Sequence, residues 1–196
     1  VALAMMDRTS DWDLCKLVLS GPKGSGKTHL SYVWAADTGA RLVAASALEQ
    51  HSLPELSQGP VVVEDVPLIA QNMDAQTALF HLHNMIHSHG HPLLLTGTGA
   101  PNLWGMSLPD LQSRIDGARV ATLDPPDDTL LTAVLAKHFD DRQLLPKVDV
   151  IPYLLLRIDR SFEAARDIVE RLDRASLTEQ RAITRAFASR VLDKTL

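Results

Sequence analysis

The fold of this chain is indicated first by residues 21 to 28, which read Gly21-Pro22-Lys23-Gly24-Ser25-Gly26-Lys27-Thr28. This stretch matches every fixed position of the Walker A pattern, GxxxxGK[ST]. An apolar run over 14–19 predicts a strand before it, and a helical pattern over 27–36 follows it. In this setting backbone amides and the positive end of the helix dipole face a bound phosphate group. We therefore interpret residues 21–28 as the loop that holds the phosphates of ATP or ADP.

Two side chains at the end of this loop carry defined chemistry. Lys27 supplies a positive charge to the β and γ phosphates, and the Thr28 hydroxyl is a ligand for Mg²⁺. The alternative is a glycine-rich turn that binds nothing. Residues 21–28 match every fixed position of the pattern and lie between a predicted strand and a predicted helix. Both observations argue against that alternative.

A second motif follows an apolar run. Residues 61–63 are all valine, and Glu64 and Asp65 come next, as in a Walker B strand. A carboxylate at this strand end lies beside the phosphate loop and can hold the Mg²⁺ shell. Glu64 replaces the usual Asp, and Asp65 stands where many ATPases have a Glu that orients water. We expect weak ATP hydrolysis by this chain alone; the alternative is an exposed acidic turn.

The pattern along the chain predicts two domains. Strands over 41–45, 61–63, 92–96 and 118–123 alternate with helices, which predicts a parallel five-stranded sheet flanked by helices. The breaker run 124–127 reads Asp-Pro-Pro-Asp, and helical patterns alone follow it. We therefore predict an α/β nucleotide-binding domain over 1–124 and a small all-α lid domain over 125–196.

Local capping patterns predict where some helices begin. Asp74 is the expected N-cap of a helix that runs to about residue 88, and Asp127 or Asp128 that of the first lid helix. Ser176 and Glu179 have the spacing of a capping box and predict the start of a last helix.

Composition excludes some functions. The net charge is −5, with a hydrophobic content of 45%, so a protein that coats duplex DNA or an anionic membrane is not expected. Cys15 is the one cysteine, which indicates a reducing compartment. The sequence has neither an apolar run of membrane-spanning length nor a secretory leader pattern. These features predict a cytoplasmic protein.

Three later segments resemble the DnaA/Hda family of AAA+ ATPases. Residues 108–115, LPDLQSRI, resemble the arginine-finger segment of that family, and 157–160, RIDR, resemble the approach to its sensor 2 helix. Residues 172–177, LDRASL, are similar to a stretch near the end of Hda. The resemblance covers nearly the whole chain and implies a P-loop AAA+ fold with an all-α lid.

The resemblance also implies roles for single residues. Arg114 would be the arginine finger, which reaches the nucleotide of a neighbouring subunit and offsets charge on the γ-phosphate. The family's sensor 2 arginine falls on Glu163, so Arg160, about one turn earlier, is the candidate to reach the nucleotide. Thr98 stands where sensor 1 often has Asp. Without the resemblance, an arginine in the place of Arg114 is more often a surface salt-bridge partner. Arg160 would then be a solvated charge near a helix N-terminus, an unfavourable place for a cation that mildly favours an anionic partner.

The function implied by the resemblance is regulation of replication initiation. A protein similar to Hda holds ADP and Mg²⁺, stimulates ATP hydrolysis by DnaA and so limits re-initiation. The implied partners are DnaA and the polymerase sliding clamp, together with a possible homo-oligomer. The family's clamp-binding peptide and a helix-turn-helix pattern are not found in this sequence, and sequence-specific DNA binding is not expected.

Several alternatives stay open on the sequence. An AAA+ helicase loader or clamp loader shares these motifs but turns over ATP itself, and a DnaA-like accessory initiation factor shares them too. A small-molecule P-loop kinase shares only the phosphate loop. Histidines crowd the segment 81–91, where His83 and His87 share a helix face; we interpret this segment as a polar helix face rather than a metal site.

Overall fold

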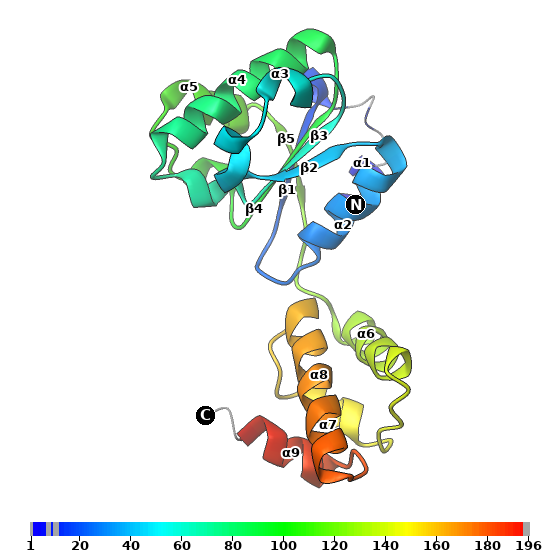
Figure 1. Ribbon diagram of the computed structural model, residues 1–196. Coiled ribbons are helices and arrows are strands. Elements are labelled where there is room, and N and C mark those ends of the chain that lie inside the picture. Colours follow the sequence, from blue (N-terminus) through cyan, green and yellow to red (C-terminus); the bar gives the residue numbers. More distant parts are fainter. Residues whose placement is uncertain (1, 7–8, 10–11, 194–196) are drawn as a thin grey trace. The chain divides into compact units, whose positions relative to one another are not determined.

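A parallel sheet of five strands lies at the centre of the N-terminal part of the chain (Figure 1). The computed structural model describes residues 2–6, 9 and 12–193, and the chain divides into two compact units, Val1–Asp124 and Pro125–Leu196. The strand order is β2-β3-β4-β1-β5, and every pairing is parallel. The strands are β1 (Lys16–Ser20), β2 (Arg41–Ala44), β3 (Val61–Glu64), β4 (Leu93–Gly97) and β5 (Arg119–Thr122).

Helices cover both faces of this sheet, because successive side chains of a strand point to opposite faces. On one face Val18 and Leu95 pack with Leu79 of α4 (Met73–His89) and Leu111 of α5 (Pro109–Asp116). On the other face Leu17, Leu19, Val62 and Leu94 pack with Trp34 of α2 (Lys27–Thr38), whose ring stacks on Trp12 at 5.3 Å between centroids. The predicted fold class, a five-stranded parallel sheet flanked by helices, is confirmed.

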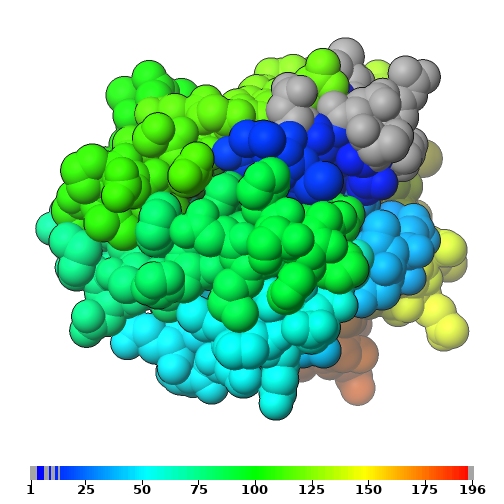
Figure 2. Space-filling view, turned by 90° about the horizontal axis from the view of Figure 1, so that it is seen from above, coloured from blue at the N-terminus to red at the C-terminus, as the bar shows by residue number. Residues whose placement is uncertain are grey.

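Short helices fill the remaining connections of this unit. They are α1 (Ala2–Met6), η2 (Asp13–Cys15), η3 (Ala45–Gln50), α3 (Leu53–Leu56), η4 (Val66–Ile69) and η5 (Pro101–Leu103). Figure 2 shows one side of the unit, where the cyan and green segments that include α3 and α4 form a continuous surface.

The start of α4 differs from the prediction. Asn72, not Asp74, is the N-cap, and its Oδ1 accepts hydrogen bonds from the backbone N–H groups of Asp74 and Ala75, each at 3.1 Å. Both residue types make good caps, so the local pattern does not choose between them. Asp74 instead lies in the first turn, where its charge favours the helix dipole.

The lid unit consists of four helices among its described residues: α6 (Asp128–Asp141), α7 (Val150–Leu155), α8 (Phe162–Glu179) and α9 (Arg185–Asp193). One apolar cluster holds them together, with Leu131, Leu135 and Leu172 fully buried. The Asp127 carboxylate caps α6 by accepting from the N–H of Leu130 at 2.7 Å, as one of the two predicted caps.

The predicted capping box of the last helix is wrong. Ser176 and Glu179 lie in the last turn of α8, which continues without interruption to Glu179. The helix ends where Gln180 adopts a left-handed φ of 50°, and α9 starts later, with the Thr184 hydroxyl accepting from the N–H of Phe187 at 3.2 Å. The spacing of a capping box also occurs inside helices. The backbone path alone shows whether such a pair lies at the start of a helix or inside one.

None of the helices in the described ranges is long and apolar enough to cross a bilayer.

Candidate nucleotide-binding site

The phosphate loop connects the end of β1 to the start of α2, as the Walker A mechanism requires. Gly26 is the N-cap of α2 and has a φ of 93°, in the region that favours glycine. A Cβ atom at Gly21 would lie 2.7 Å from the carbonyl oxygen of Leu123, so a side chain there would displace the backbone after β5. These two glycines are therefore needed by the backbone path of the loop.

Lys27 lies inside the loop. Its side chain is only 7% exposed, and its Nζ donates hydrogen bonds to the carbonyl oxygens of Gly21 at 2.7 Å and Pro22 at 2.8 Å. Burial lowers the pKa of Lys27, while the nearby Asp65 carboxylate acts in the opposite direction. Ser25 Oγ is buried and has no hydrogen-bond partner among the residues that the structure describes. An anionic ligand at this loop would lie beside the ammonium group of Lys27 and the unpartnered hydroxyl of Ser25. These residues therefore fit a phosphate group.

The acidic end of β3 lies next to this loop. A hydrogen bond joins the side chains of Glu64 and Thr28, the two residues predicted to share Mg²⁺. Burial raises the pKa of Glu64; the bond to Thr28 offsets part of this, and the neighbouring Asp65 adds to it. Glu64 Oε1 is buried, and no residue in the described part of the chain forms a hydrogen bond with it. An unsatisfied carboxylate oxygen beside a hydroxyl is a donor set that fits Mg²⁺.

Asp65 is held by a residue that the sequence reasoning missed. The backbone of Asp65 is left-handed, with a φ of 55°, and its N–H donates to Thr96 Oγ1 at 3.2 Å. Thr96 is 1% exposed and lies on β4, directly beside β3. A threonine after three buried leucines was the available signal. Thr98, the residue chosen from the sequence, is exposed, and its carbonyl oxygen accepts from Trp104 Nε1 at 3.0 Å.

Arg114 lies at the other end of β1. It is exposed in the last turn of α5, and its carbonyl oxygen accepts a hydrogen bond from Lys16 Nζ at 2.7 Å. Lys16 is the first residue of β1, whereas the phosphate loop follows Ser20, the last. The fold therefore brings together four of the predicted site residues, Lys27, Thr28, Glu64 and Asp65. Arg114 lies near the opposite end of β1, at its first residue.

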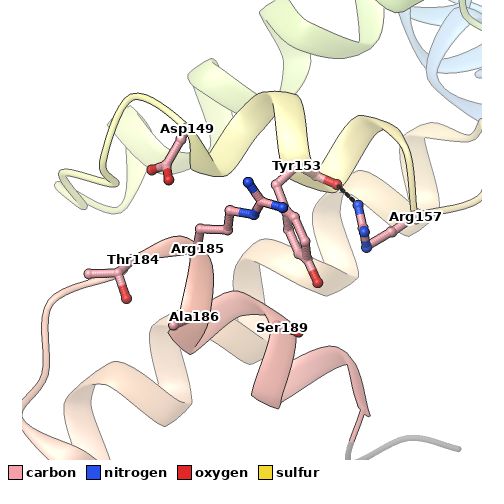
Figure 3. Close-up of a pocket in the computed structure, with 7 residues that line it drawn as sticks. All are labelled: Asp149, Tyr153, Arg157, Thr184, Arg185, Ala186 and Ser189. Carbon is pink, nitrogen blue, oxygen red and sulfur yellow. Dashed lines mark hydrogen bonds between the residues drawn. The ribbon is translucent and has the colours of Figure 1, made fainter.

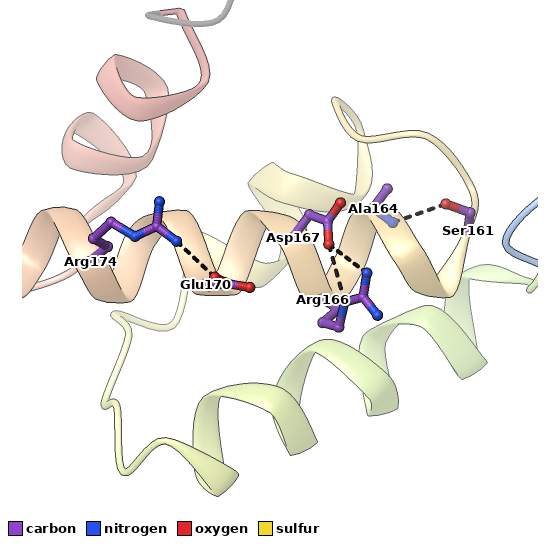
Figure 4. A network of polar contacts seen from close by, with 6 residues as sticks. All are labelled: Ser161, Ala164, Arg166, Asp167, Glu170 and Arg174. Atoms are coloured by element: carbon purple, nitrogen blue, oxygen red, sulfur yellow. Dashed lines mark hydrogen bonds and ion pairs between the residues drawn. The ribbon is translucent and has the colours of Figure 1, made fainter. Parts of the chain in front are cut away.

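Arg160 lies in the lid and forms an ion pair there. Its Nη2 is 2.8 Å from Asp128 Oδ1, and both side chains are more than half exposed. Glu163 follows in the first turn of α8. Figure 4 shows this helix with its Ser161 cap and two exposed ion pairs, Arg166–Asp167 and Arg174–Glu170. Contact between Arg160 and a nucleotide stays a prediction.

The histidine segment has one buried member. His83 is 6% exposed, and burial is the largest of the causes that lower its pKa to about 4. Its ring lies 6.4 Å from that of His87, measured between centroids. Across the described ranges, no three or more His, Cys, Asp or Glu residues are grouped so that they could hold a metal ion.

Comparison with known proteins shows which solved structures share this fold. Its structure is similar to domain III of the replication initiation protein DnaA from Thermotoga maritima, with a TM-score of 0.81 and 19% identity over 98% of this chain and 88% of that one. It is also similar to AMPPCP-bound DnaA from Aquifex aeolicus, with a TM-score of 0.70 and 17% identity over 91% of this chain and 63% of that one. A RuvB mutant from Thermotoga maritima gives a TM-score of 0.72 at 14% identity, over 98% of this chain and 65% of that one.

The sheet, its flanking helices and the phosphate loop form an AAA+-like P-loop fold, as in these structures. Residues 127–192 match the family described as the Hda lid domain. The lid is therefore similar to that of Hda, and the fold of the chain is similar to that of DnaA domain III.

Proposed function

We propose that this chain is a nucleotide-bound regulator, similar to Hda, which stimulates ATP hydrolysis by DnaA and thereby limits re-initiation of replication. The observation that carries the proposal is that Arg114 and the phosphate loop lie at opposite ends of β1. The match of residues 127–192 to the Hda lid domain and the similarity of the fold to DnaA support DnaA as the partner.

The separation favours action on a neighbouring molecule. A strand rises about 3.3 Å per residue, so the two ends of β1 are roughly 13 Å apart. Arg114 lies at the end of β1 that is far from the phosphate loop, and its side chain is exposed to solvent. The hydrogen bond from the Lys16 ammonium group to the Arg114 carbonyl oxygen holds the backbone at this place. Its guanidinium group is therefore available to the nucleotide of another protein rather than to the loop of its own chain.

The loop of this chain would hold its own nucleotide with Mg²⁺. Lys27 would bind phosphate oxygens, and Thr28 and Glu64 would hold the metal ion, which supplies positive charge to the phosphates. Aquifex aeolicus DnaA binds the ATP analogue AMPPCP, which supports an adenine nucleotide. ADP as the preferred form rests on the resemblance to Hda. Asp65, shorter than the usual Glu and fixed through its N–H by Thr96, favours slow turnover, which suits a stably held ligand.

In the proposed complex the two proteins have different tasks. This chain presents the Arg114 guanidinium to the γ-phosphate of ATP held by DnaA, where negative charge develops during hydrolysis. A finger of this kind accelerates hydrolysis by about 10³–10⁵ where it has been measured in GTPases. The sliding clamp would bring the two proteins together on replicating DNA.

The test follows labelled ATP held by DnaA. The protein is added with DNA-loaded clamp, as wild type, as Arg114→Ala and as the control Arg166→Ala, which removes an exposed arginine of the lid. We expect wild type and the control to speed conversion to labelled ADP and Arg114→Ala to lose this effect, with nucleotide binding by the chain unchanged in all three.

Two results would contradict the proposal. If wild type has no effect although it binds nucleotide, the chain does not act on DnaA in this way. If the chain alone shows rapid ATP turnover that DNA stimulates, an AAA+ loader is the better reading. An accessory initiation factor would instead promote opening of the origin by DnaA without loss of its ATP.

A further inference from the structure

The lid contains a pocket that the proposed function does not use. It has a volume of about 580 Å³ and is formed by residues of α7 and α9, of the segments just before these helices, and by Arg157 just after α7 (Figure 3). Tyr153 and Arg157 line it from the α7 side, and Thr184, Arg185 and Ser189 line it from the α9 side. Every one of these residues belongs to the lid unit.

Tyr153 lies at the centre of the pocket. The residue is only 8% exposed, and Figure 3 shows its ring extending from α7 toward α9, with the hydroxyl at the far end. Within the described ranges, that hydroxyl makes no hydrogen bond; the contacts of this side chain are with the two arginines. The hydroxyl oxygen is not one of the buried atoms that lack a partner, so it is open to solvent and can donate to a ligand that enters the pocket.

The two arginines flank this ring without a carboxylate partner among the described residues. The guanidinium carbon of Arg157 is 4.0 Å from the ring centroid, and that of Arg185 is 5.3 Å from it. The Arg157 side chain has one long hydrogen bond, 3.4 Å to the carbonyl oxygen of Tyr153. Other lid arginines do form ion pairs, among them Arg160, Arg174 and Arg190. Two like charges close to one ring leave most of their planar donors available for an anion.

The start of α9 adds to the positive character of the pocket. Arg185 is the first residue of this nine-residue helix, whose dipole places partial positive charge there. Thr184 accepts from the N–H of Phe187, which leaves its hydroxyl proton for another acceptor. Asp149 also lines the pocket and is the one acidic group among the lining residues. Its charge is outnumbered by the two arginines, so the balance favours an anionic ligand.

We propose that this pocket is a second anion site of the protein, which binds the phosphate group of a small phosphorylated ligand through Arg157, Arg185 and the Tyr153 hydroxyl. Phosphate is the chemistry that fits, because it accepts several hydrogen bonds at once from planar guanidinium groups and from a hydroxyl. The phosphate group can come from free inorganic phosphate or from a nucleotide.

The test uses the full chain labelled with ¹⁵N and saturated with ADP, so that the phosphate loop is already occupied. Inorganic phosphate is titrated at constant ionic strength, and the amide signals of residues 185–187 are followed by NMR. A parallel titration with excess ADP distinguishes a nucleotide source from a free phosphate source. The variants are Arg157→Gln with Arg185→Gln, Tyr153→Phe, and the control Arg174→Gln, which removes an arginine that pairs with Glu170.

We expect saturable shifts of these amides with one of the two ligands. The double arginine variant should weaken that binding by tenfold or more, and Tyr153→Phe by a smaller factor with the ring contacts retained. The control should bind as wild type does. Shifts that rise linearly without saturation, or that are equal in all variants, would overturn the proposal. Saturable binding of an acidic peptide or a DNA strand at these residues, with no response to phosphate or ADP, would also overturn it.

Discussion

Lys16 Nζ donates a hydrogen bond to the carbonyl oxygen of Arg114, at 2.7 Å, across 98 residues of sequence. Lys16 is 2% exposed, and burial is the main cause that lowers its pKa, with the positive charge of Arg114 second. The last carbonyl groups of a helix have no partner inside the helix and carry partial negative charge. The buried ammonium group therefore caps the end of α5, the helix that presents the predicted finger.

Replacing Lys16 with Met should loosen this helix end. The substitution keeps the length of the side chain but leaves the Arg114 carbonyl without its donor, at a cost of about 1–3 kcal/mol in unfolding free energy. Denaturant unfolding measures this cost, and the stimulation of DnaA should fall while nucleotide affinity is kept. Lys137→Met, at an exposed position, is the control. Unchanged stability and stimulation in the Lys16 variant would show that the contact does not position α5.

His83 should make the protein less stable in mild acid. The unfolded chain binds a proton at this residue near pH 6.5, but the folded chain does so only near pH 4. Unfolding free energy should therefore fall as the pH drops from about 6.5 to about 4, by up to roughly 1.4 kcal/mol per pH unit. Unfolding curves at several pH values measure this slope. His83→Gln should flatten it, while His81→Gln, at an exposed position, should leave it as in wild type.

Glu64 should link Mg²⁺ to nucleotide binding. The raised pKa of Glu64 means that its carboxyl group becomes protonated at a higher pH than an ordinary carboxyl. Mg²⁺ should increase nucleotide affinity at neutral pH. As the pH falls, this increase should disappear at a higher pH than it would with a glutamate of ordinary pKa, and calorimetric titrations measure it. Glu64→Gln should bind nucleotide with no gain from Mg²⁺ at any pH.

The same substitution has a second consequence, for stability. A carboxyl group whose folded pKa is raised loses stabilising effect as the pH rises through the interval between its usual and its raised value. At neutral pH Glu64→Gln should therefore leave the protein as stable as wild type or more stable. A clear loss of stability would show that Glu64 is held by favourable contacts instead.

Thr96 should matter more than Thr98. Thr96→Val keeps the shape of the side chain but removes the oxygen that accepts from the Asp65 N–H, so we expect a loss of about 1–2 kcal/mol in unfolding free energy. Thr98→Val changes an exposed side chain and should be neutral. Nucleotide affinity is measured for both variants together with stability. A change in affinity in Thr96→Val would indicate that Asp65 has moved. Equal effects of the two variants would contradict the assignment.

Much of the site could be predicted because its signals are local. The phosphate loop needs its glycines, Lys27 and Thr28 within a few consecutive residues, and the carboxylates follow their strand directly. Local signals were weaker at helix ends. Asn72 and Asp74 are both good caps two residues apart, and Ser176 has cap spacing although it lies inside α8. Such patterns indicate which residues are able to cap a helix. They do not show at which residue the helix begins.

The alternation of strands and helices and the phosphate loop could be predicted from the sequence, because hydrophobic periodicity and loop chemistry act between near neighbours. Tertiary structure alone decided which distant groups meet. Thr96 reaches Asp65 because β4 lies beside β3, and Lys16 reaches Arg114 because α5 ends over the start of β1. The order of strands in a sheet depends on how whole elements pack, and no short window of sequence contains that information.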